Sequence, residues 1–428
     1  MGSFLLAVWL VLIFVRPMDW WNPVLGWELV NLTAIATLLV SIGALFREFK
    51  QLWRIPQVKL LFGLLVGVTL SGVYPFFWSV RMQTAFQDFG KLFVMFVLIL
   101  LWGSNPTTFR LLLWSVLLST AWMAIHGILQ IQTGKGFGGL PPLDRNSDGS
   151  LYQIVAFGIF NDPNDLCLVF IAGIPFLYAE FRTASQFIFK LLALMLVPLF
   201  TYAAWLTNSR GGVLGILGMM GAHAIVSTHG IRRWIFSAIG VVTIMIFAPS
   251  RFSGGFSRET DRLILWGDGI NLFQRYPLFG TGYNTFPDYS STYQVAHNSY
   301  IQILAETGIL GYFFYIFLIF ITIIQLRRAS NLKKEALVAT DRAYLGACFS
   351  SLVGYLTSCY FLSRQYNAVF YVLFALTTCR ILITCRDSQL SQRIVGLWKR
   401  DLKYGTLFSL VSIPGLWIIV RFGNTTLR

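Results

Sequence analysis

TGILGYFFYIFLIFITIIQL, residues 307–326, is a run of 20 consecutive residues without a charged side chain. A helix that crosses a membrane needs about 20 such residues, because the hydrocarbon core of a bilayer is roughly 30 Å thick. The run lies within a longer apolar stretch, 300–326, and ends at the basic pair Arg327 and Arg328. It therefore predicts a transmembrane helix.

Similar apolar runs occur along the whole chain. They cover approximately 4–15, 25–46, 60–76, 92–103, 111–130, 165–180, 191–207, 213–228, 235–249, 300–326, 343–363 and 367–384, and a weaker thirteenth run, 404–421, contains Pro414. No repeat of fixed period and no low-complexity linker separates them. The pattern predicts an all-α, polytopic helical membrane protein with about 12 transmembrane helices, forming a single integral domain over 1–428.

The composition supports this class and excludes others. Of 428 residues, 56% are apolar and 12% are charged, and the mean hydropathy is +0.66. Soluble proteins carry about 25% charged residues, so the composition excludes a water-soluble enzyme. We interpret the net charge of +15 as the positive-inside bias of a membrane protein and not as a nucleic-acid site. The five cysteines lie in or beside apolar runs, where we expect small apolar side chains and no disulfides or metal ligands.

The distribution of basic residues predicts the topology. The predicted loops 47–59 and 327–342 and the tail after Thr384 are basic. If the N-terminus lies inside, alternate crossing places all three on the cytoplasmic side. Segments 131–164, 208–212 and 250–299 then lie on the outer side. In 250–299, four arginines balance four acidic residues. The long outer loops 131–164 and 250–299 are the places where we expect chemistry.

The segment Asn208-Ser-Arg-Gly-Gly212 places Arg210 on the outer side, against the positive-inside bias. Arg210 stands at the start of a glycine-rich helix, whose N-terminal amides favour an anion. The alternative is an arginine that only extends to the membrane surface. The spacing of Gly211 and Gly215 indicates close helix packing.

Outer loop 250–299 carries two further polar features. Arg262 lies four residues before Trp266, in a stretch, 262–276, with the pattern of an amphipathic helix. An interfacial helix with a solvated arginine is the alternative interpretation. His297 begins the run 300–326 on the outer side, and Glu306 follows nine residues later inside it. A carboxylate inside a membrane is a functional candidate, although a buried hydrogen bond to a neighbouring helix explains it equally well.

These pieces together resemble the O-antigen ligase and polymerase family of bacterial surface-polysaccharide enzymes. The matching residues are Phe160-Asn-Asp-Pro-Asn164, Ser209-Arg-Gly-Gly212, Arg262 with Trp266, Gly280-Thr-Gly282, His297-Asn-Ser299 and Glu306-Thr-Gly308. They define an O-antigen ligase-like core over 155–311. The resemblance implies a GT-C-like membrane glycosyltransferase of the bacterial inner membrane. Such an enzyme transfers a glycan from an undecaprenyl-diphosphate carrier to an acceptor hydroxyl on the periplasmic face, without a metal or another cofactor.

The resemblance also implies roles for individual residues. Arg210 and Arg262 match the two arginines that hold the diphosphate, and His297 matches the proposed general base. The expected substrate-binding residues are Asn161, Asn164, Ser209, Asn298 and Glu306. The acceptor is a glycolipid, a glycan or a protein hydroxyl, and the remaining expected partners are membrane lipids. The alternative function is a flippase that transports lipid-linked glycan without catalysis.

Overall fold

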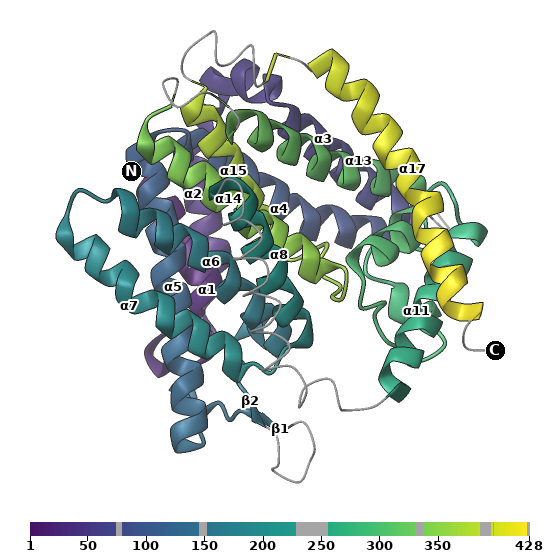
Figure 1. Cartoon of the computed structure of the whole chain (residues 1–428), viewed down its shortest axis with the longest axis horizontal. Helices are drawn as coiled ribbons and strands as arrows, with labels where there is room; N and C mark the ends of the chain where they lie inside the picture. Colours follow the sequence, from purple (N-terminus) through teal and green to yellow (C-terminus); the bar gives the residue numbers. More distant parts are fainter. Residues whose placement is uncertain are drawn as a thin grey trace.

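The computed structural model describes residues 1–73, 79–144, 152–227, 256–330, 332, 337–385, 395–396 and 398–425. These residues form a helical bundle with one short hairpin (Figure 1). The helices are α1 (Gly2–Val15), α2 (Leu29–Arg54), α3 (Pro56–Leu70), α4 (Val80–Gly103), α5 (Pro106–Thr133), α6 (Pro163–Thr183), α7 (Phe187–Leu206), α8 (Arg210–Ser227), α11 (Phe256–Arg275), α12 (Phe286–Tyr289), α13 (Ser299–Ser330), α14 (Ala339–Cys359), α15 (Ala368–Thr384) and α17 (Trp398–Thr425). Short 3-10 turns are η1 (Pro17–Asp19), η2 (Asn22–Val24), η3 (Ser71–Val73), η4 (Phe137–Gly139) and η5 (Gly158–Phe160).

The predicted fold class is confirmed. Within the described residues, nine helices are long and apolar enough to cross a membrane, and α15 is a shorter apolar helix. The runs 213–228 and 343–363 form α8 and α14, which are not among these nine. The weak run 404–421 lies in α17, whose segment Arg400–Arg421 is one of the nine. The run 235–249 lies outside the described residues.

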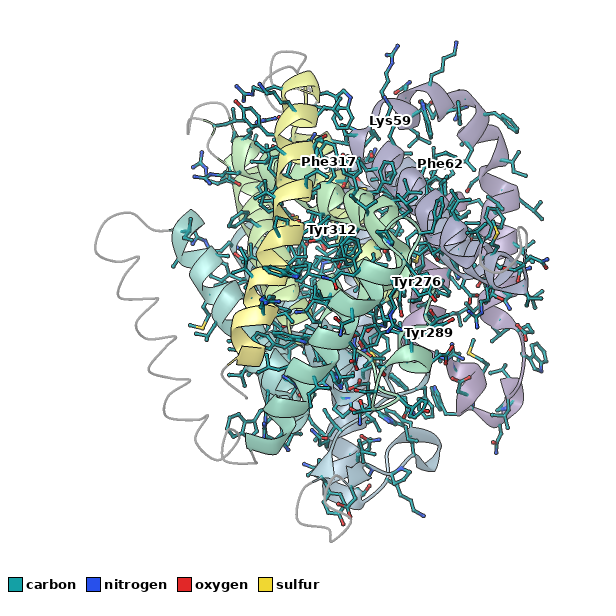
Figure 2. All side chains as sticks on the ribbon, turned by 90° about the vertical axis from the view of Figure 1, so that its right-hand side faces the viewer. Lys59, Phe62, Tyr276, Tyr289, Tyr312 and Phe317 are labelled. Atoms are coloured by element: carbon teal, nitrogen blue, oxygen red, sulfur yellow. The ribbon has the colours of Figure 1, made fainter. Side chains whose placement is uncertain are left out.

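The segment 47–59 differs from the prediction, because it is not a loop. Helix α2 continues to Arg54, and α3 begins at Pro56 after a single extended residue, Ile55. Proline fits the first position of a helix, and it pushes the residue before it out of the helical region. The basic residues of this segment are therefore helical. Figure 2 shows one of them, Lys59, at the end of the bundle opposite the hairpin.

The structure also adds a β-hairpin to the predicted all-α fold. Strands β1 (Leu143–Asp144) and β2 (Tyr152–Gln153) pair antiparallel. β2 contacts the turn between α7 and α8, because Gln153 Nε2 donates to Thr207 O at 2.8 Å and Asn208 Nδ2 donates to Tyr152 O at 3.2 Å. The hairpin is at the bottom of Figure 1, and we call this end of the bundle the hairpin end.

Helix α13 is the central element of one half of the bundle. It packs against α3 so closely that a Cβ on Gly67 would lie 2.8 Å from the Cα of Gly311. On another side it packs against α17, where the Tyr312 hydroxyl lies 2.9 Å from Ser412 Oγ (Figure 2). Small residues at such crossings let two backbones approach closely, and this favours association of helices within a membrane.

Small residues also bring α8 against α14. A Cβ on Gly211 would lie 3.2 Å from the Leu362 side chain, and a Cβ on Gly215 would clash with Ser358 Oγ at 2.1 Å. Ser358 Oγ donates a hydrogen bond to Gly211 O at 3.0 Å. The close packing predicted from the glycine spacing is confirmed. It brings the start of α8 beside the end of α14.

At the end opposite the hairpin, a buried ion pair joins the bundle. Arg110 of α5 lies 2.8 Å from Glu180 of α6, and the Tyr344 hydroxyl of α14 donates to the same carboxylate. The Glu180 side chain is fully buried. A carboxylate at this depth is tolerated because its oxygens are paired with a charge and a hydroxyl.

Helix α13 is interrupted at Gly308, which has φ 61° and ψ −162°. The segment 277–282 lies against the break. Its peptide groups exchange backbone hydrogen bonds with α13, from Thr281 N to Ala305 O at 3.0 Å and from Ile309 N to Pro277 O at 2.8 Å. A Cβ on Gly308 would lie 2.5 Å from the backbone of Leu278. Only glycine fits this conformation and this contact.

We therefore expect Gly308→Ala to destabilise the protein. The backbone strain alone costs about 1–3 kcal/mol, and the clash with Leu278 adds to it. Thermal unfolding of the purified protein in detergent would measure the loss. Gly43→Ala, in helix α2 with no atom within 4 Å of the added Cβ, is the control. Equal melting temperatures of the two variants would contradict this account of the break.

Candidate functional site

The turn before α8 places Arg210 at the first position of the helix. Asn208 adopts a left-handed conformation with φ 49°, and Ser209 then caps the helix by accepting a hydrogen bond from Gly212 N at 3.0 Å. A serine cap satisfies one of the amides that a helix start leaves free. The remaining amides and the half-buried Arg210 create a positive end that attracts anions.

The start of α6 lies beside the start of α8. Asp162 caps α6 by accepting a hydrogen bond from Asn164 N at 2.8 Å. Asn164 Oδ1 in turn accepts a hydrogen bond from Ser209 Oγ at 2.7 Å. Asn164 and Ser209 therefore hold two helix starts together, and Asn161, just before them, is exposed.

The start of α13 carries His297 and Asn298. Asn298 caps the helix, because its Oδ1 accepts hydrogen bonds from Tyr300 N at 3.0 Å and from Ile301 N at 3.1 Å. Its Nδ2 is buried and has no hydrogen-bond partner among the described residues. His297, with φ 49°, is half-buried directly before the cap. An unsatisfied buried donor beside His297 fits a ligand that supplies an acceptor.

Helix α11 is attached to the same turn. Trp266 Nε1 donates a hydrogen bond to Ala296 O at 3.0 Å, and Ala296 directly precedes His297. Arg262 lies one helical turn before Trp266, so it is on the same face of α11. The charge of Arg262 acts on His297 and lowers its pKa. The structure thus brings Arg262 and His297 together.

The loop 360–367 between α14 and α15 adds a residue that sequence reasoning missed. Arg364 forms ion pairs with Asp162 and Asp165 at the start of α6. Its backbone N donates to Ser299 Oγ at 2.7 Å, and Ser299 Oγ donates to Leu362 O at 2.6 Å. The Leu362 side chain lies close to the start of α8, since a Cβ on Gly211 would be 3.2 Å from it. Loop 360–367 therefore connects the starts of α6, α8 and α13.

A signal for Arg364 is present in the sequence. The residue lies in a short segment between the apolar runs 343–363 and 367–384, which alternate crossing places on the outer side. This is the positional argument that singled out Arg210. It identifies an outer arginine, but it does not reveal the two carboxylates, which lie about 200 residues earlier in the chain.

The pKa of His297 is lowered to about 4. Burial is the largest cause, since it disfavours the charged imidazolium. The positive charges of Arg262 and Arg364 act in the same direction, and the negative charge of Asp162 opposes them. At neutral pH, His297 is therefore an uncharged imidazole that can accept a proton.

Glu306 is fully buried and holds the loop before α13 in place. Its Oε1 accepts hydrogen bonds from Phe286 N at 3.1 Å and from Gln302 Nε2 at 2.9 Å. Gln365 Nε2 donates to Oε2 at 3.5 Å. These contacts fit an internal anchor that positions α12 and loop 360–367.

The structure brings some of the predicted site residues together, and it engages others in hydrogen bonds within the protein. Arg262 and His297 lie together, and Arg210 stands on the neighbouring helix start, joined to them through loop 360–367. Ser209, Asn164 and Glu306 are occupied by hydrogen bonds within the protein. Their predicted substrate-binding roles, and those of Asn161 and Asn298, remain predictions.

We expect Glu306→Leu to destabilise the protein more than Glu306→Gln. Leucine leaves the buried donors of Phe286 and Gln302 without an acceptor, and each such loss costs about 1–3 kcal/mol, whereas glutamine keeps one acceptor oxygen. Hydrogen exchange of the peptide that contains Phe286, together with thermal unfolding, would measure the difference. Equal protection in both variants would contradict the anchoring role.

The comparisons with known proteins agree with the motif analysis. No curated protein matches the chain. A family model described as O-antigen ligase matches residues 192–316. This segment contains Arg210, Arg262 and His297, and it begins after Asn161 and Asn164. The resemblance predicted from the motifs is thus confirmed: residues 192–316 of this multi-pass membrane protein are similar to the O-antigen ligase family.

Proposed function

We propose that this protein transfers a glycan from an undecaprenyl-diphosphate carrier to an acceptor hydroxyl, at the hairpin end of the bundle. The match to the O-antigen ligase family indicates glycan transfer in polysaccharide biosynthesis. The observation that carries the finer proposal is the juxtaposition of a neutral His297 with Arg262, beside the helix start that bears Arg210.

The two arginines suit a diphosphate leaving group. A guanidinium binds phosphate oxygens with two parallel charge-assisted hydrogen bonds, which a lysine cannot reproduce. Arg210 adds the amides at the start of α8, which attract the same anion. As the glycosidic bond breaks, negative charge grows on the diphosphate, and fixed positive groups stabilise it most in the transition state.

His297 serves as the general base in this proposal. The acceptor hydroxyl oxygen forms a new bond to the anomeric carbon, while its proton passes to the imidazole. The bond between the anomeric carbon and the diphosphate oxygen breaks, and its electron pair stays on the diphosphate. This chemistry requires no metal or cofactor, and the proton leaves His297 to water afterwards.

The bound donor should strengthen this base. In the free protein, the pKa of His297 is about 4, which makes the imidazole a weak base. A diphosphate held by Arg262 brings negative charge near His297, and nearby negative charge raises the pKa of an imidazole. His297 would therefore reach a useful basicity only when the donor is present.

The location follows from the charge distribution. The basic residues of segment 47–59 lie at the end opposite the hairpin, as Lys59 illustrates in Figure 2. The positive-inside bias assigns that end to the cytoplasm. In the bacterial inner membrane, the hairpin end and its site then face the periplasm, where a glycolipid, a glycan or a protein offers the acceptor hydroxyl.

We expect Arg210→Lys and Arg262→Lys to lose most transfer activity while the protein remains folded. The ammonium group keeps the charge but cannot bind the diphosphate at two points. Transfer from a synthetic lipid-diphosphate glycan, at subsaturating donor, would measure the loss. Arg275→Lys, an exposed position on α11, is the control and should transfer normally. Normal transfer by both test variants would overturn the diphosphate assignment.

We expect His297→Ala to lower turnover by about 10²–10⁴, the usual contribution of a general base. Donor binding should change little, because the arginines hold the diphosphate. In the wild-type protein, kcat/KM should fall only as the pH drops through about 4, where His297 of the free protein protonates. The fall in kcat should occur at higher pH, because the bound donor raises the pKa.

His297→Asn separates catalysis from structure. Asparagine tolerates the left-handed backbone at this position and can form hydrogen bonds, but it cannot accept the proton. Normal turnover of this variant, with an unchanged acid limb, would show that His297 is not the base.

A further inference from the structure

We propose that Arg364 is a positioning residue, which fastens loop 360–367 to the start of α6 and keeps the neighbouring His297 uncharged. The catalytic part of this inference rests on the proposed function above. The structural part does not, because it follows from contacts that exist without any substrate.

The guanidinium of Arg364 occupies a closed polar cluster. Its side chain is only 15% exposed; Nη2 donates a hydrogen bond to Asp162, and the carboxylate of Asp165 forms an ion pair at Nε. Asn367 Nδ2 donates to Asp165 Oδ1 at 2.9 Å and closes the cluster from the start of α15. A planar group that binds two carboxylates at once fixes both the distance and the orientation of the segments that carry them.

Contacts of loop 360–367 fix the position of the backbone on both sides of His297. Arg364 N and Leu362 O both bond to Ser299 Oγ, two residues after His297. Tyr360, at the start of the same loop, packs edge-to-face on Trp266 with ring centroids 5.4 Å apart. Trp266 in turn bonds to Ala296 O, directly before His297. Loop 360–367 thus braces the His297 turn on both sides.

Arg364 is unsuited to be a third ligand of the diphosphate. Two carboxylates already pair with its charge, Nη1 donates to Ser363 O at 2.9 Å, and an approaching anion would be repelled by the carboxylates. Asp165 and Asp162 hold the pKa of Arg364 above its ordinary value, even though burial opposes its charge. The group therefore stays charged and in place, and it acts on the site through its position and its field.

Three charged neighbours of His297 determine whether its imidazole is easier or harder to protonate. Arg262 from α11 and Arg364 from loop 360–367 disfavour the imidazolium, whereas Asp162 before α6 favours it. Removal of the Arg364 charge deletes one of the two positive groups and leaves Asp162 uncompensated. Both effects make His297 easier to protonate, so its protonation should move to higher pH.

The test measures protonation of His297 directly. Exchange of the imidazole C2 proton of each histidine, followed by mass spectrometry from pH 3 to 9, gives a titration midpoint in the full-length protein without any activity assay. We expect Arg364→Gln to raise the midpoint of His297 by about one pH unit or more. Arg364→Lys, which retains the charge, should leave the midpoint near that of the wild type, and Arg275→Gln is the matched control.

A second variant guards against misfolding. Arg364→Gln leaves Asp165 buried without its cation, so Arg364→Gln combined with Asp165→Asn removes that unpaired charge. Asp165 is not among the groups that act on His297, so the double variant should show the same upward shift. An unchanged midpoint in a folded Arg364→Gln or double variant would overturn the proposal.

Transfer assays add a readout that a purely structural role would not move. Under the proposal, the kcat/KM lost by Arg364→Gln at pH 5 recovers at pH 7, where His297 is neutral again. A loss of equal size at every pH, in both Arg364→Gln and Arg364→Lys, would leave only a structural brace and would overturn the electrostatic part. If the wild type transfers no glycan but the midpoint still shifts, the proposed function fails and the role of Arg364 stands.

Discussion

The ion pairs of Arg364 with Asp162 and Asp165 are the constraint on which the rest of the site depends. They hold loop 360–367 against the start of α6, and this loop also contacts the starts of α8 and α13. The three helix starts thus meet at one end of the bundle. The hydrogen bond between Ser209 and Asn164 joins the starts of α6 and α8, and the ion pairs add loop 360–367, which reaches the start of α13.

Buried charges of this kind are costly in a membrane protein, and the structure tolerates them only where they are paired. Arg364 and its two carboxylates lie at the hairpin end, and Arg110 with Glu180 lies at the opposite end. Glu306 is buried beside loop 360–367 and accepts hydrogen bonds from a backbone amide and two amide side chains. Each group therefore connects elements that apolar packing alone would leave free to slide.

Most of the polar side chains around His297 are used to hold the helix starts in place. The hydrogen bonds of Ser209, Asn164 and Asn298 cap helices and hold their starts in register. They leave Arg210, Arg262 and His297 as the half-buried groups that gather around these caps. Several of the predicted substrate-binding residues thus stabilise the arrangement of the helices, and the proposed chemistry rests on Arg210, Arg262 and His297.

The sequence by itself determined the membrane class and most helices, because about 20 apolar residues form a helix wherever they lie in a bilayer. Together with the family resemblance, it also predicted Arg210, Arg262 and His297 as site residues, and their roles remain a proposal. The continuous helix at 47–54, the hairpin and the anchoring role of Glu306 were decided by the tertiary structure. So was the pairing of Arg364 with Asp162, because two residues 202 positions apart share no local pattern. Local sequence sets where a helix begins and which side chains it carries, whereas the electrostatics of a site depend on which helix starts the packing brings together.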